Sequence, residues 1–283
     1  MYRTERILIL TAVLFVGLGL TLAVTRGVLG GGEAELGGLV WLLTLLMTMI
    51  AGIGAFWLRS GVSVAGATTL SSNTIPLLRL PLITVVPAVL VVGFVIFMRL
   101  FESGALQAVV LVLAALSLAS VYWAQMHSVN WEDRYFGLAQ AILNLLSHLA
   151  AFLFFSVIYG LKVRALYSAT AVGLVTCLLM YEMLSRDATW HRAMGLPVEG
   201  RRTTLALLSI AAGVLAGEIT WGLNYWAALS TLVGGAFLLL VFYVIYGVVS
   251  QYVERSVTPS IFVEFGTVAA LGVGVILVSA FLT

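Results

Sequence analysis

The chain has 283 residues, of which 62% are hydrophobic and only 9% are charged. Soluble globular proteins average roughly 45 to 50% apolar and 25% charged residues, so this composition indicates a polytopic membrane protein and excludes an ordinary soluble domain. The formal net charge of +2, with basic residues scattered singly, excludes a basic face for nucleic acid. The single cysteine, Cys177, excludes an intrachain disulfide and a CxxC metal or redox motif.

The first apolar run, residues 7–24, follows a short basic N-terminus. The apolar region of a secretory signal is about 7 to 15 residues long, and this run exceeds it. It has the length needed to cross the hydrocarbon core of a bilayer. We therefore expect an uncleaved first transmembrane helix.

Apolar windows of about 20 residues predict an all-α integral membrane fold with nine transmembrane helices and no soluble domain. The predicted spans are residues 6–25, 36–58, 80–100, 105–125, 135–161, 163–184, 203–220, 226–250 and 261–282. Residues 60–75, between the second and third spans, are mostly small and carry no charge. They fit either an ordinary loop or a re-entrant segment whose backbone is satisfied by protein or water.

The distribution of basic residues predicts the orientation, because Lys and Arg near span ends are retained in the cytoplasm. With the N-terminus inside, ten basic residues fall on the inner side and only four on the outer side. We therefore expect a cytoplasmic N-terminus and, after nine spans, a C-terminus on the outer side. The outer four are Arg26, Arg99, Lys162 and Arg164, and the inner ten are Arg3, Arg6, Arg59, Arg79, Arg134, Arg186, Arg192, Arg201, Arg202 and Arg255.

Two spans contain similar sequences. Residues 141–160 read AILNLLSHLAAFLFFSVIYG, and residues 228–247 read ALSTLVGGAFLLLVFYVIYG. Aligned positions differ by 87 residues, both segments end in F-x-VIYG, and neither contains Asp, Glu, Lys or Arg. This likeness predicts an internal repeat.

The predicted repeat unit is three helices long, at residues 105–185 and 203–283. An odd number of spans places the second copy upside down, which is the inverted repeat found in many secondary transporters. Outside the two copies, we expect an N-terminal three-helix region at residues 1–104 and a cytoplasmic interfacial loop at residues 186–202.

Polar side chains recur every four residues on one face of the fifth span, at Gln140, Asn144 and His148. They could line a polar cavity in which His148 carries a proton, contacts a substrate or is a single axial ligand to a haem or chlorin. They could equally form interhelical hydrogen bonds, commonly worth about 0.6 kcal/mol. We predict no cofactor, and a bis-histidine haem is disfavoured because we expect His127 and His191 in loops.

Glu218 lies near the outer end of the seventh span, shortly before Trp221 and Asn224. It could be a partly buried acid that couples to protons or binds a cationic head group. It could also be an interfacial carboxylate beside the aromatic belt at the membrane surface. Across the membrane, Asp133 belongs to a short charged turn that we expect to be the N-terminal end of the fifth span.

The most charged segment is residues 182–202, at the end of the sixth span. Trp190, Arg192, Arg201 and Arg202 suit an interfacial segment that contacts anionic lipid heads. A solvated loop after a cytoplasmic extension of the sixth helix is an equally good interpretation. No HExxH-like spacing occurs, and we predict no metal site.

No nucleophile, nucleotide-binding or histidine-box motif is present, so nothing in the sequence predicts an enzyme. Our first functional hypothesis is a small-molecule or lipid-like permease with a polar site between the fifth and eighth spans, using Gln140, Asn144, His148, Glu218 and Asn224. The alternative is a non-catalytic subunit or scaffold of a larger membrane complex, which could bind lipid or pigment. Expected partners are membrane lipids and other membrane subunits, not nucleic acid.

Overall fold

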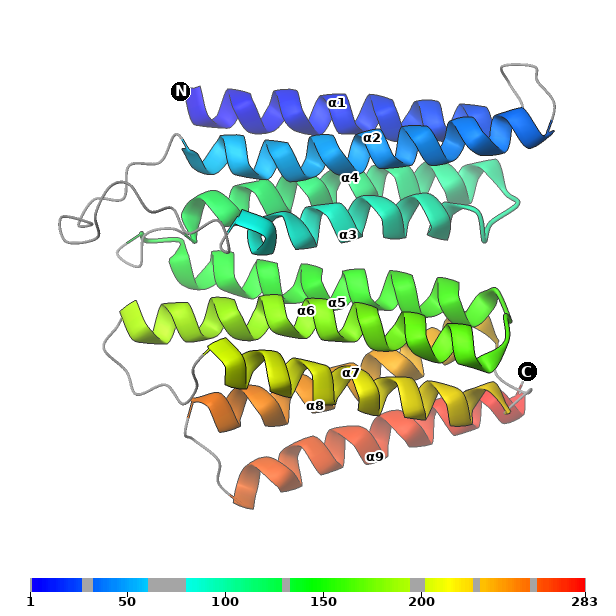
Figure 1. The fold of residues 1–283 in the computed structure, drawn as a ribbon. Helices are drawn as coiled ribbons and strands as arrows, with labels where there is room; N and C mark the ends of the chain where they lie inside the picture. The colour runs from blue at the N-terminus through cyan, green and yellow to red at the C-terminus, as the bar shows by residue number, and fades with distance from the viewer. Residues whose placement is uncertain are drawn as a thin grey trace. The chain divides into compact units, whose positions relative to one another are not determined.

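The computed structural model describes residues 2–26, 33–60, 80–128, 133–193, 202–225, 230–254 and 259–282. Within these ranges it contains nine α-helices and no strand (Figure 1). The helices are α1 (Tyr2–Thr25), α2 (Glu33–Ser60), α3 (Leu80–Met98), α4 (Gly104–His127), α5 (Phe136–Gly160), α6 (Ala165–Ala193), α7 (Arg202–Asn224), α8 (Thr231–Val253) and α9 (Pro259–Leu282). Each predicted span corresponds to one of them, and the prediction of an all-helical chain is confirmed for these residues.

Seven of the described helices are long and apolar enough to cross a membrane: α1, α2 and α4 to α8. The apolar segments of α3 and α9 are shorter, at Thr84–Met98 and Pro259–Val275. Large apolar side chains such as Leu8, Trp41 and Leu145 are exposed along these helices. Such an apolar exterior suits lipid rather than water, so the architecture is that of a multi-pass helical membrane protein. Residues 61–75 of the segment that fits a loop or a re-entrant turn lie outside the described residues.

The chain packs as two compact units, Met1–Leu146 and Ser147–Thr283. The first unit contains α1 to α4, with α1 against α2 and α4, and α3 against α2 and α4. Leu14, Leu18, Leu90 and Leu118 are fully buried in it. Tyr122 is also fully buried, and its hydroxyl donates a hydrogen bond to the Ala51 carbonyl of α2 at 3.1 Å.

In the second unit, α6 and α7 are the most closely packed pair, because small residues face one another. A Cβ on Gly213 would lie 2.6 Å from the Gly173 carbonyl oxygen, and a Cβ on Gly217 would lie 3.0 Å from the Ala169 carbonyl oxygen. Small residues allow this backbone approach in membrane helix pairs, where association depends on packing rather than on the hydrophobic effect. The α6 helix, which carries Glu182, Arg186 and Asp187, is thereby fixed against α7.

Candidate functional site

The cytoplasmic half of α6, by the predicted orientation, carries a carboxylate and a guanidinium that pair within one helical turn. Arg186 Nη1 donates to both carboxylate oxygens of Glu182, at 2.8 and 3.1 Å. The Arg186 and Glu182 side chains are only 12% and 8% exposed. Residues four apart face each other on a helix, so this pair compensates its own charge inside the protein.

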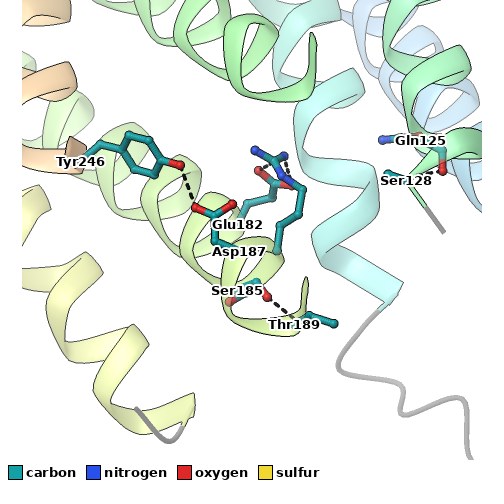
Figure 2. Close-up of polar contacts among 8 residues, drawn as sticks. Gln125, Ser128, Glu182, Ser185, Asp187, Thr189 and Tyr246 are labelled. Atoms are coloured by element: carbon teal, nitrogen blue, oxygen red, sulfur yellow. Dashed lines mark hydrogen bonds and ion pairs between the residues drawn. The ribbon is translucent and has the colours of Figure 1, made fainter. Parts of the chain in front are cut away.

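A second carboxylate of α6, Asp187, has a partner on another helix. The Tyr246 hydroxyl, from α8, donates to Asp187 Oδ2 at 2.7 Å. Figure 2 shows the two side chains pointing toward one another from their helices, with Glu182 on the same helix as Asp187. Tyr246 is a neutral donor, so this hydrogen bond orients Asp187 without cancelling its charge.

His148 brings α5 to the same place. Its imidazole ring lies 5.3 Å from the ring of Phe242, 5.8 Å from that of Tyr243 and 5.6 Å from that of Tyr246, measured between centroids. His148 is the middle residue of α5, about 18 Å from either end at 1.5 Å per residue. We call His148, Glu182, Arg186, Asp187 and Tyr246 the polar cluster.

Two further titratable residues extend from the polar cluster toward the C-terminal end of α8. His191 Nδ1 donates to the backbone carbonyl of Asp187 at 2.9 Å, and its Nε2 lies 3.8 Å from Glu254 Oε1. Burial raises the pKa of the Glu254 carboxyl; the nearby Asp187 adds to this shift and His191 opposes it. Titratable groups therefore continue from the middle of α5 to one end of α8.

Of the five predicted cavity residues, His148 belongs to this cluster. Gln140 and Asn144 are half-buried on the same helix, within the packing unit that ends at Leu146. Glu218 is exposed on α7. Asn224 Nδ2 donates to Ser168 Oγ and to the Thr220 carbonyl, both at 2.8 Å, and so links the end of α7 to the start of α6.

Residues 186–193, which begin the predicted interfacial segment, are helical and belong to α6. Trp190 and Arg192 lie in its last turns, but their side chains are outside the described part, as is the whole of Arg201. Arg202 is exposed at the start of α7. The lipid-contact role of these residues stays a prediction.

The expectation that His127 and His191 lie in loops was wrong, because both are in the last turns of helices, α4 and α6. His127 Nδ1 lies 2.7 Å from Asp133 Oδ2, and Asp133 Oδ1 accepts the backbone N–H of Tyr135 at 2.9 Å. Asp133 therefore satisfies a backbone donor at the start of α5, which is where we expected a helix N-terminus.

Sequence reasoning missed the pairing of Asp187 with Tyr246. We placed the end of the sixth span at residue 184, so Asp187 fell in the charged segment after it, interpreted either as an interfacial segment or as an extension of the sixth helix. The spacing of Glu182 and Arg186, four residues apart, was a signal that the helix continues. The only signal for Tyr246 in the sequence was that it belongs to the repeated F-x-VIYG pattern.

Candidate ligands for a metal ion or a haem were sought among the His, Cys, Asp and Glu side chains of the described residues. Within them, no three His, Cys, Asp or Glu side chains form a group that could hold a metal ion. The His148 ring is bordered by three rings of α8, so the face toward α8 is occupied by side chains.

Comparison with known proteins gives one match. Residues 20–279 match the family model described as "Protein of unknown function (DUF5656)". The match covers most of the chain, and the protein therefore belongs to this family. No curated protein and no solved structure matches it.

Proposed function

We propose that this member of the DUF5656 family is a proton-coupled permease for a small molecule, with its polar site where α5 and α8 cross. The observation that carries the proposal is the hydrogen bond from Tyr246 to Asp187 beside His148. Ionisable groups within membrane spans are costly and for that reason often form proton relays or substrate sites.

The contacts between α5 and α8 support the predicted inverted repeat. With the offset of 87 residues, Phe155 is equivalent to Phe242, and their rings lie 6.1 Å apart between centroids. Two equivalent residues that touch each other are expected where a pseudo-two-fold axis passes between the copies. The pair lies in the middle of the contact between α5 and α8.

Contacts on either side of this pair are related by the same exchange. His148 contacts Tyr243, and a Cβ on Gly235 would lie 2.7 Å from Ser156 Cα. Swapping the copies converts His148 into Gly235 and Ser156 into Tyr243, so one contact becomes the other. The two helices thus use the same face, and the side chain in one copy, His148, is replaced by a glycine in the other. Sites in inverted-repeat transporters lie near midplane at such an interface.

Charge in the polar cluster supports proton coupling. It contains two carboxylates, Glu182 and Asp187, and one guanidinium, Arg186. One guanidinium beside two carboxylates leaves one negative charge uncompensated, and we propose that Asp187 is the group neutralised by taking up a proton or by binding a cationic substrate. His148, whose ring lies 5.6 Å from that of Tyr246, is a further ionisable side chain of the cluster.

The proposal includes a topology in which all nine helices cross the membrane, with the N-terminus cytoplasmic and the C-terminus outside. Ten basic residues against four support this orientation. His191 and Glu254 would then give protons access to Asp187 from the cytoplasmic side. Reporter fusions to the C-terminus test this arrangement, and a cytoplasmic C-terminus would contradict it.

Transport can be tested with the full chain in vesicles that contain a trapped pH-sensitive dye. We expect at least one class in a panel of amino acids, sugars, nucleosides and carboxylates to move protons when added outside. Asp187→Asn should reduce that movement at least about tenfold, the effect of losing one charged hydrogen bond. Tyr246→Phe should reduce it less, because the carboxylate remains.

Glu264→Gln is the matched control, since it removes one carboxylate from an exposed position on α9. It should leave the proton movement unchanged. All variants should elute as single species with wild-type helix content. The proposal is wrong if no solute moves protons, or if folded Asp187→Asn is as active as the wild type.

A second candidate function is a subunit of a larger membrane complex, and one feature of α9 favours it. Gly266, Ala270 and Gly274 lie four residues apart on exposed positions, and a Cβ on either glycine would meet nothing within 4 Å. Small residues at this spacing typically pack against another membrane helix. Gentle purification should then yield a stoichiometric partner chain that Gly274→Leu releases; a partner retained by this variant would contradict the use of this face.

A further inference from the structure

The first packing unit contains a cavity of about 240 Å³ at the predicted outer end of α1, α3 and α4. Two arginines, Arg26 after α1 and Arg99 after α3, line it together with Gln107 of α4. The remaining lining residues are Thr21, Leu22, Thr25, Val95 and Met98. Arg26 and Arg99 are exposed whereas Val95 and Met98 are buried, so the cavity has a basic rim and an apolar floor.

Gln107 holds one of the guanidinium groups in place. Arg26 Nε donates to Gln107 Oε1 at 2.7 Å, and Gln107 Nε2 donates to the Phe101 carbonyl at 2.6 Å and to the Met98 carbonyl at 3.3 Å. Arg26 uses its Nε for this contact, which leaves the two terminal nitrogens to bind a ligand. An arginine orientated by one bond in this way is prepared for bidentate recognition of an oxyanion.

The position of Gly104 explains how Arg26 reaches the cavity. A Cβ at this residue would lie 2.6 Å from Arg26 Nη2 and 2.9 Å from Nη1, so the guanidinium lies against the first residue of α4. The N-terminal end of a helix carries partial positive charge. An anion bound there would be attracted both by the guanidinium and by the helix end.

Nearby acids do not neutralise the arginines within the described part of the chain. Among those residues no ion pair includes Arg26 or Arg99, and Glu102, the closest acid in sequence, is exposed and forms none. The Arg99 guanidinium lies over the Trp41 ring at 5.9 Å, a contact that leaves its charge intact. The cavity thus presents two positive charges and a positive helix end.

We propose that this cavity binds the phosphate of an anionic phospholipid. Phosphate is the oxyanion that paired arginines and a helix N-terminus recognise together. The floor of Leu22, Val95 and Met98 suits the glycerol and the upper acyl chain of a lipid. The volume is below the roughly 300 to 1,000 Å³ of pockets for whole drug-sized ligands, which fits a head group whose chains stay in the bilayer.

Native mass spectrometry of the full chain in detergent, titrated with phosphatidylglycerol, tests the site. We expect one tightly bound lipid, and Arg26→Gln and Arg99→Gln should each weaken its binding about tenfold or more. Gly104→Ala keeps both charges but displaces the Arg26 guanidinium, and it should also weaken binding. That variant separates a shaped site from general attraction by positive charge.

Arg164→Gln is the matched control, because Arg164 is exposed and precedes α6 on the same predicted side of the membrane. It should bind phosphatidylglycerol like the wild type. The proposal would be overturned if Arg164→Gln weakened binding as much as Arg26→Gln. It would also be overturned if the single variants Gly104→Ala and Arg26→Gln both bound the lipid like the wild type. Inorganic phosphate alone is a further arm: if it raises the melting temperature of the wild type but not of Arg26→Gln, the ligand is free phosphate and the lipid assignment is wrong.

Discussion

The close approach of α6 and α7 gives the sharpest stability prediction, because three glycines of α7 form a graded series. A Cβ on Gly213 would lie 2.6 Å from the Gly173 carbonyl oxygen and 3.0 Å from Cys177 Cβ. On Gly217 the nearest atom, the Ala169 carbonyl oxygen, would be 3.0 Å away. On Gly222 a Cβ would meet nothing within 4 Å. Alanine substitutions should therefore destabilise the protein in the order Gly213, Gly217, Gly222.

The size of the effect follows from these distances. The Gly213 contact is 0.8 Å shorter than ordinary contact at 3.4 Å, and the opposing atom belongs to the backbone, which cannot rotate away. Separating two helices by about 0.5 to 1 Å forfeits a quarter to a half of the dispersion energy at their contact. Overpacking of this kind costs about 1 to 3 kcal/mol. Replacing Gly by Ala also favours the helix by up to about 1 kcal/mol, and the comparison with Gly222→Ala cancels most of that gain.

Thermal unfolding in detergent, followed by circular dichroism, measures the difference. At about 2 to 4 °C per kcal/mol for a chain of this size class, Gly213→Ala should melt several degrees below Gly222→Ala. Gly217→Ala should fall between them. Equal melting temperatures for the three variants would refute the assignment of α6 and α7 as a backbone-to-backbone contact.

Three further predictions concern single side chains. Asp133→Ala should cost about 0.5 to 2 kcal/mol of stability because the Tyr135 N–H loses its acceptor at the start of α5, and thermal unfolding against Asp133→Asn, which can still cap, checks this. Tyr122→Phe should lower the free energy of unfolding by no more than about 1.5 kcal/mol, because the Ala51 carbonyl that loses the hydroxyl donor lies within helix α2. A larger loss in the same assay would contradict this limit. Glu254 has a folded-state pKa above its usual 4.5, so the folded protein binds the extra proton and stability should fall as the pH rises from 4.5 through the folded pKa. Glu254→Gln should lack that part of the slope when melting temperature is measured against pH, and an unchanged slope would contradict the burial of this carboxyl.

Most of the architecture could be predicted from composition and apolar run length. A membrane helix needs about 20 apolar residues, a constraint strong enough to show in a single sequence. The helix ends were harder, because a helix can continue past the apolar core when its side chains pair with each other. This happened in α6, which extends to Ala193 beyond the Glu182 and Arg186 pair.

The candidate site could be predicted only in part, since it depends on tertiary contacts between residues 59 to 98 positions apart. His148 was found because a histidine within an apolar span is conspicuous on its own. Asp187 becomes a candidate site residue only through its hydrogen bond with Tyr246, which is 59 residues later in the chain. Glu218 is equally conspicuous in the sequence, yet it is exposed on α7, because sequence position does not determine which face of a helix is covered.

The shared F-x-VIYG sequence connects packing with the proposed activity. In α5 its tyrosine, Tyr159, packs against Gly234 of α8, and the room for that ring exists because the second copy has a glycine there. In α8 the equivalent tyrosine, Tyr246, lies against His148 and bonds Asp187 instead. At one end of the contact between α5 and α8, the Tyr159 ring therefore packs against Gly234. At the other end, Tyr246 lies beside the titratable residues His148 and Asp187. At the offset of 87 residues, Ser147 and His148 of α5 stand in place of Gly234 and Gly235 of α8. Under the proposed inverted repeat, this difference at two adjacent positions would restrict the proposed proton site to one end of the contact, on the side of Glu254.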